Sequence, residues 1–95
     1  MRAPNAHAMS GDITLERVQA IVTRIAGPDR IPRDAGPDTP LRDGGYWLDS
    51  VDLLETMIAC ETEFEVAFDP EVDFSDRTLG TVATLFRLIQ AKRGA

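Results

Sequence analysis

A serine flanked by carboxylates is the residue whose type and setting most clearly suggest chemistry in this sequence. Ser50 follows Asp49 and precedes Asp52 by two positions, inside a stretch from 43 to 76 that contains 11 Asp or Glu residues and no Lys or Arg. A serine nucleophile needs a base to remove its proton. Only carboxylates lie close to Ser50 in the sequence, so we expect this serine to be modified by another protein rather than activated by its own chain.

The residues after Ser50 predict that it opens an amphipathic helix. Asp49 is expected to cap this helix, which runs from Ser50 to about Phe64. With the cap supplied by Asp49, the Ser50 hydroxyl is less needed for structure. The dipole and free N–H groups of a helix start also tolerate a phosphate, so Ser50 is compatible with a phosphodiester on its oxygen.

The predicted helix separates into faces at about 100° per residue. The face expected to join the core carries Leu53, Met57, Cys60 and Phe64, with Leu54 at its margin. The face expected to meet solvent carries Asp52, Glu55, Thr56, Ala59 and Glu63. Val51 and Ile58 share a flank between the two faces. They either widen the core stripe or form an apolar docking strip fringed by carboxylates, which suits a partner with basic side chains around a hydrophobic hollow.

The chain before Ser50 is predicted to contain one amphipathic helix and a long connection. Asp12 is expected to cap the helix, whose apolar residues recur at helical spacing as far as Ile25. The connection over 27–45 carries four prolines. We expect Ile31 and Leu41 to anchor it to the core.

Two further helices are predicted after the serine helix. Pro70 is well placed to open a short one near 71–74, and Thr78 is expected to cap a final one. The predicted inner face of the final helix is apolar and comprises Leu79, Val82, Leu85, Phe86 and Ile89. No convincing strand alternation is present, so the sequence predicts an all-α fold of three longer helices and one short third helix around a single core.

The composition indicates a small acidic domain. The 95 residues carry a formal net charge of −6. Nucleic acids and anionic membrane surfaces require basic protein surfaces, so neither is expected as a partner. An acidic face instead favours basic protein partners, unless the charge serves solubility alone. Without a secretory signal or an apolar membrane span, a cytoplasmic monomer is expected.

The possible metal ligands do not form a recognisable site. Cys60 is the only cysteine, so it has no disulfide partner and is expected to be a small buried hydrophobe. The acids of 69–76 lack the glycine and the final acid of a helix-loop-helix calcium site. No metal is therefore predicted.

Segments 48–55 and 60–64 together resemble the acyl carrier protein family. They read Leu-Asp-Ser-Val-Asp-Leu-Leu-Glu and Cys-Glu-Thr-Glu-Phe, and are similar to the family's Asp-Ser-Leu-type attachment site and the acidic helix that it opens. The resemblance covers roughly 12–92, including residues 16–18 in the first helix and the closing helix over 78–89.

The resemblance implies an acyl carrier domain over 12–93, after a disordered N-terminal tail at 1–11. It implies an acyl-carrier-protein-like four-helix bundle with a long loop between the first and second helices. Ser50 would carry 4′-phosphopantetheine, transferred from coenzyme A by a phosphopantetheinyl transferase. The thiol of this arm would hold an acyl group as a thioester, and the protein would not be an enzyme itself.

The resemblance also implies which residues meet partners. The positions that match the family's docking residues are Asp49, Val51, Asp52, Glu55, Ile58 and Glu61. Met57 and Phe64 are expected to line the cavity that sequesters the acyl chain. The implied partners are the transferase and acyl-loading, ketosynthase- or acyltransferase-type enzymes with basic docking patches, in a fatty-acid-, lipid- or polyketide-like pathway.

Two positions depart from the family pattern. Trp47 stands where the family usually has Gly, and Thr62 where a third consecutive acid often occurs. Trp47 is expected either to pack on the core or to change how the arm and partners approach. Together with the long proline-containing loop, these departures favour a specialised carrier over the general fatty-acid carrier.

Three alternatives compete with this interpretation. An aminoacyl or peptidyl carrier uses the same arm but typically has an uncharged residue before the serine, where this chain has Asp49. A hydrolase would need His7, which lies in the predicted tail, and the chain lacks the strand-turn-helix elbow around the serine. The third alternative is an acidic interaction module that is never modified.

Overall fold

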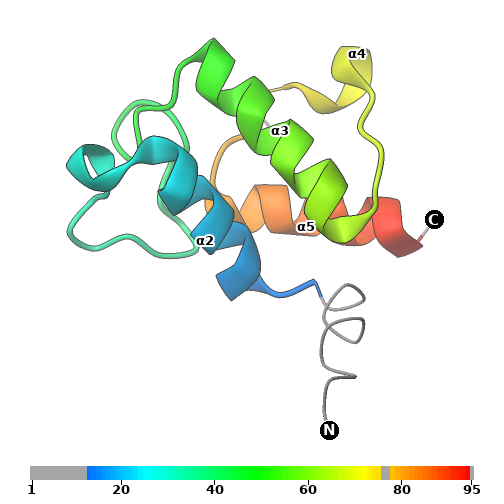
Figure 1. Ribbon diagram of the computed structural model, residues 1–95, viewed down its shortest axis with the longest axis horizontal. Coiled ribbons are helices and arrows are strands. Elements are labelled where there is room, and N and C mark those ends of the chain that lie inside the picture. Colours follow the sequence, from blue (N-terminus) through cyan, green and yellow to red (C-terminus); the bar gives the residue numbers. More distant parts are fainter. Residues whose placement is uncertain (1–12, 76–77, 95) are drawn as a thin grey trace, which may run out of the picture.

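The described residues form four α-helices and one short 3₁₀ turn (Figure 1). The computed structural model describes residues 13–75 and 78–94, and within these ranges it has no β-strand. The elements in chain order are α2 (Leu15–Ala26), η1 (Pro28–Arg30), α3 (Ser50–Phe64), α4 (Pro70–Asp73) and α5 (Val82–Gly94). The predicted all-α fold, with three longer helices, a short third helix and a long loop before α3, is confirmed.

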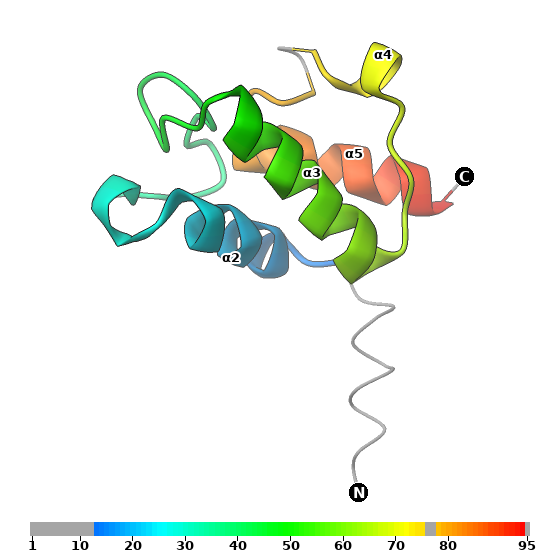
Figure 2. The same ribbon diagram turned by 45° about the horizontal axis from the view of Figure 1, so that its top comes forward.

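The core lies between the three longer helices. α3 crosses α2 and α5 diagonally (Figure 2), and each of these three helices contacts the other two. The largest fully buried side chains are Tyr46, Phe64, Leu41, Met57, Leu85 and Ile89. Two of them come from the connection before α3, so this connection contributes directly to the core.

The α2 helix begins later than predicted. Thr14 Oγ1 accepts a hydrogen bond of 3.1 Å from the Arg17 backbone N–H, so Thr14 is the N-cap and the prediction of Asp12 in that role is wrong. Asp12 and the predicted tail at 1–11 lie outside the described residues. The helix ends at Ala26, one residue beyond the predicted end.

The connection between α2 and α3 is fixed to the start of α5. Pro40 forms an isolated antiparallel bridge with Thr81. Leu41 is fully buried, as predicted. Ile31 is 41% exposed and does not anchor the loop, because Arg30 is the residue of this turn whose side chain reaches back to α2 and α3.

The α5 helix also begins later than predicted. Thr81 Oγ1 accepts a hydrogen bond from the Thr84 N–H, and Thr84 Oγ1 accepts one from the Thr81 N–H, at 3.1 and 2.9 Å. Thr78 is not a cap, because it bonds to the turn at Ser75. Of the predicted inner face, Leu79 is buried ahead of the helix and Phe86 is half-buried.

A buried carboxylate joins the α4 helix to α5. Asp73 is 4% exposed, and its carboxylate accepts hydrogen bonds of 2.7 Å from Lys92 Nζ and from the Asp69 backbone N–H. Burial raises the pKa of Asp73, but the hydrogen bonds from Lys92 and Asp69, together with the charge of Lys92, outweigh burial and hold this pKa below its usual range. The ion pair therefore holds the end of α4 against α5.

Candidate functional site

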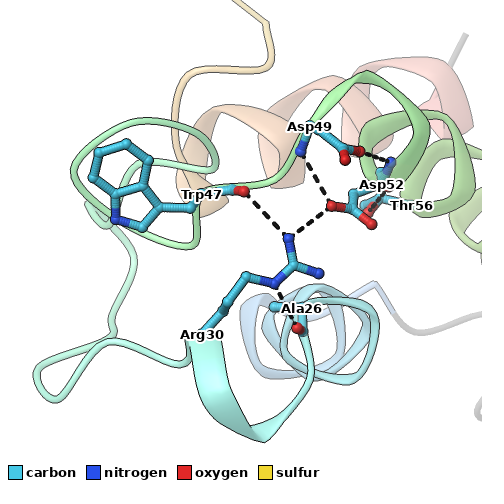
Figure 3. Close-up of polar contacts among 6 residues, drawn as sticks. All are labelled: Ala26, Arg30, Trp47, Asp49, Asp52 and Thr56. Atoms are coloured by element: carbon cyan, nitrogen blue, oxygen red, sulfur yellow. Dashed lines mark hydrogen bonds and ion pairs between the residues drawn. The ribbon is translucent and has the colours of Figure 1, made fainter.

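The start of α3 is capped without the Ser50 hydroxyl. Asp49 Oδ1 accepts the Asp52 N–H at 2.8 Å, and Asp52 Oδ2 accepts the Asp49 N–H at 3.1 Å, which forms a reciprocal capping box (Figure 3). The prediction of Asp49 as the cap is confirmed. Ser50 is exposed, and its hydroxyl makes no hydrogen bond to another described residue. This hydroxyl is therefore free for modification.

Arg30 fixes the backbone on both sides of this helix start. Its guanidinium donates to the Ala26 carbonyl at 2.9 Å, to the Trp47 carbonyl at 3.2 Å and to Asp52 Oδ2 at 2.8 Å (Figure 3). The Arg30 hydrogen bond, followed by that from the Asp49 N–H, holds the pKa of Asp52 below its usual range. Asp52 is thus already paired with a cation. The sequence did not indicate that Arg30 would form this ion pair.

Trp47 is held on the surface next to the site. Its φ of 56° is left-handed, the residue is 59% exposed, and its indole points away from Arg30 and Asp52 (Figure 3). Its neighbours Tyr46 and Leu48 are buried instead. The alternative in which Trp47 packs on the core is therefore wrong.

The outward side of α3 is partly apolar. Val51, Leu54 and Ile58 are 65%, 48% and 52% exposed. These exposures favour the docking strip over a wider core stripe. Thr56 was predicted to face solvent but is fully buried. Its burial leaves no unpaired donor, because its hydroxyl donates a hydrogen bond to the Asp52 carbonyl one turn earlier.

The predicted docking carboxylates fall into two groups. Asp49 and Glu55 are exposed. The Asp52 side chain, predicted to face solvent, is only 15% exposed because of its ion pair with Arg30. Glu61 Oε2 accepts a hydrogen bond of 2.8 Å from the Phe68 N–H. Within the described chain, three of the four carboxylates thus have structural partners, because Asp49 caps α3, and Glu55 alone has none.

A pocket of about 200 Å³ opens beside Ser50. Three segments line it: the loop before α3, the first turn of α3 and the connection after α4. Its lining residues are Arg42, Ser50, Leu53, Phe74, Ser75 and Leu79. Met57 and Phe64 lie in the core, 2% and 0% exposed, and are not among them. Their role in holding an acyl chain stays a prediction.

Cys60 is buried, as predicted, and burial raises the pKa of its thiol to about 12. The thiol therefore stays protonated at neutral pH. The ranges 13–75 and 78–94 contain no group of three or more His, Cys, Asp or Glu residues arranged to hold a metal ion. None of the described helices is long and apolar enough to cross a membrane.

A family model described as phosphopantetheine attachment site matches residues 16–86, which is most of the chain. The chain belongs to this family. It is a phosphopantetheine carrier, and the group that it carries covalently is 4′-phosphopantetheine. The resemblance to acyl carrier proteins is confirmed at the level of the family, and the helical fold is compatible with theirs. No curated protein and no solved structure gave a significant match.

The start of α3 in this carrier fits such a group chemically. It offers an exposed serine with an unused hydroxyl, at a helix N-terminus where backbone dipoles favour an anion. Carriers of this family interact with a phosphopantetheinyl transferase and with further enzymes, and are generally not catalysts.

Proposed function

We propose that this carrier holds an acyl group on a 4′-phosphopantetheine arm attached to Ser50 Oγ. The observation that carries the proposal is the free Ser50 hydroxyl, since Asp49 and Asp52 cap the helix in its place. The arm supplies a terminal thiol, and a thioester on it holds the acyl group. The chain orients the arm and presents its cargo to enzymes of a fatty-acid-, lipid- or polyketide-like pathway, without catalysis of its own.

The acyl cargo is favoured over an aminoacyl or peptidyl one by the acidic surroundings of the serine. Asp49 directly precedes Ser50, and Glu55 is exposed one turn along the same helix. The family match in turn favours a modified carrier over an acidic module that is never modified. Loading reactions on the carrier with its arm, using acyl-transferring or amino-acid-activating enzymes, distinguish the two cargo classes.

Mass spectrometry of the intact protein tests the attachment. After incubation with coenzyme A and a broad-specificity phosphopantetheinyl transferase, we expect the full chain to gain the mass of one phosphopantetheinyl group. Fragmentation should place this mass on Ser50, because its hydroxyl is exposed and unused. An unchanged mass, or an added mass on a peptide without Ser50, would refute the proposal.

We further propose that partners dock on the outward side of α3. The exposed residues Val51 and Ile58 supply apolar contact area, and Asp49 and Glu55 supply charge for basic patches on the transferase and on acyl-loading, ketosynthase- or acyltransferase-type enzymes. Asp52 and Glu61 act on docking indirectly, because their carboxylates hold the ends of the surface in place.

Reversing the charge of Glu55 should weaken this docking. We expect Glu55→Lys to lower the kcat/KM of the transferase about tenfold, mainly through KM, because a basic partner would then meet a cation. Thermal stability should hardly change, since Glu55 is exposed and has no partner among the described side chains. Asp34→Lys, the same charge change in the exposed loop, is the control. Equal losses of kcat/KM in both variants would show that the net charge of the protein, and not this surface, determines the activity of the transferase.

A further inference from the structure

The pocket beside Ser50 contains a cation whose side chain has no partner among the described residues. Arg42 lines this pocket, and its exposed side chain forms no ion pair or hydrogen bond with any other described residue. By contrast, Arg30 and Lys92 are paired with Asp52 and Asp73. Arg42 is also the last basic residue before the acidic stretch from 43 to 76. Its free charge therefore lies next to the serine in an otherwise acidic region.

Three of the six residues that line the pocket are apolar. Leu53 and Leu79 are 7% and 6% exposed, and Phe74 is half-buried beside them. A pocket of about 200 Å³ with this lining suits a ligand that has an anionic group next to a short branched hydrocarbon. The phosphodiester of phosphopantetheine and the dimethyl-bearing segment that follows it have this chemistry.

The local charges also favour a cation at this place. A phosphodiester on Ser50 carries one negative charge at neutral pH and adjoins the carboxylate of Asp49. Asp52 adds little repulsion, because Arg30 already pairs with it. A guanidinium offers several N–H donors in a plane and pairs well with phosphate oxygens. Arg42 is the described cation that lines the same pocket as Ser50.

We propose that Arg42 pairs with the phosphodiester of the arm on Ser50, while Leu53, Phe74 and Leu79 receive the first segment of the arm. This inference rests on the proposed attachment at Ser50. It assigns Arg42 as a residue that restrains the base of the arm, whereas the far end with the thiol stays able to extend toward partners.

The test compares the full chain without and with the arm, in the wild type, Arg42→Gln, Arg42→Lys and Arg33→Gln. Arg33 is exposed in the same loop and does not line this pocket, so its variant is the matched control. In the wild type, we expect the arm to lower the unfolding equilibrium constant in urea about threefold, the usual size for an exposed ion pair. Arg42→Gln should lose this effect, Arg42→Lys should keep part of it, and Arg33→Gln should keep all of it.

Nuclear magnetic resonance gives a second measurement, which a change in stability alone would not affect. Attachment of the arm should shift the Arg42 Nε–H signal, and the phosphorus-31 line of the attached arm should be broad in the wild type, because the guanidinium restrains the phosphate. In Arg42→Gln the phosphorus line should become narrow, as for a freely rotating phosphodiester.

Intact mass separates the two ways in which the inference can fail. If no mass is added, the attachment at Ser50 fails and the role of Arg42 falls with it. If the mass is added but Arg42→Gln shows the same effect of the arm and the same phosphorus line width as the wild type, only the role of Arg42 is overturned.

Discussion

Replacing Ser50 by alanine is expected to abolish attachment of the arm completely. The transferase needs the Ser50 oxygen as the new ester atom, and alanine has no group that can replace it. The fold should not suffer, because the Asp49–Asp52 capping box satisfies the helix start and the Ser50 hydroxyl makes no hydrogen bond to the rest of the described chain. We expect the free energy of unfolding to change by less than about 0.5 kcal/mol.

Ser75→Ala is the matched control for this variant. Ser75 lines the same pocket and is the other serine among the described residues, and its hydroxyl contacts Thr78 instead of standing at a helix start. Intact mass should show full attachment in Ser75→Ala and none in Ser50→Ala. The reverse pattern, or equal attachment in both variants, would contradict Ser50 as the attachment residue.

Replacing Gly45 by alanine is expected to destabilise the protein by about 3 kcal/mol, at the upper end of the costs of overpacking. The added Cβ would lie 2.0 Å from the Pro40 carbonyl oxygen and 2.8 and 2.9 Å from two further Pro40 backbone atoms. Backbone hydrogen bonds hold this turn together, since the Tyr46 N–H donates to the Pro40 carbonyl at 3.0 Å. The clash can therefore be relieved only by opening the loop that carries Arg42 and Trp47.

Urea unfolding checks this prediction, with Gly36→Ala as the control. A Cβ on Gly36 would approach only the Asp34 carbonyl oxygen, at 3.9 Å, so its effect should stay within about 0.5 kcal/mol. If both variants are equally stable, the turn at Gly45 relaxes at little cost and the clash is not a real constraint.

Local signals predicted the serine helix well, and were ambiguous elsewhere. Asp49 as cap and the apolar spacing agree, so α3 starts at Ser50 and ends at Phe64 as expected. Two threonines precede the last helix, however, and each is an acceptable cap. Thr81 holds that position because it exchanges hydrogen bonds with Thr84, whereas Thr78 closes a turn with Ser75.

Only the part of the site that lies on α3 could be predicted from the sequence. Helical periodicity placed Ser50 at the helix start and Val51 and Ile58 on a flank between the two faces, and left open whether that flank is exposed. It could not foresee the pairing of Asp52 with Arg30, which lies 22 residues away in the chain, because the path of the loop decides that contact. The pocket was missed for the same reason, since its lining comes from three separate segments.

The exposed position of Trp47 has a practical consequence for following this protein in solution. It is the single tryptophan of the chain, so indole fluorescence arises from one known place, three residues from Ser50. With 59% of its surface in water, the ring is open to quenchers and to coverage by a docking enzyme. The emission wavelength of the indole and its quenching therefore report partner binding at the attachment end of α3, without any added label.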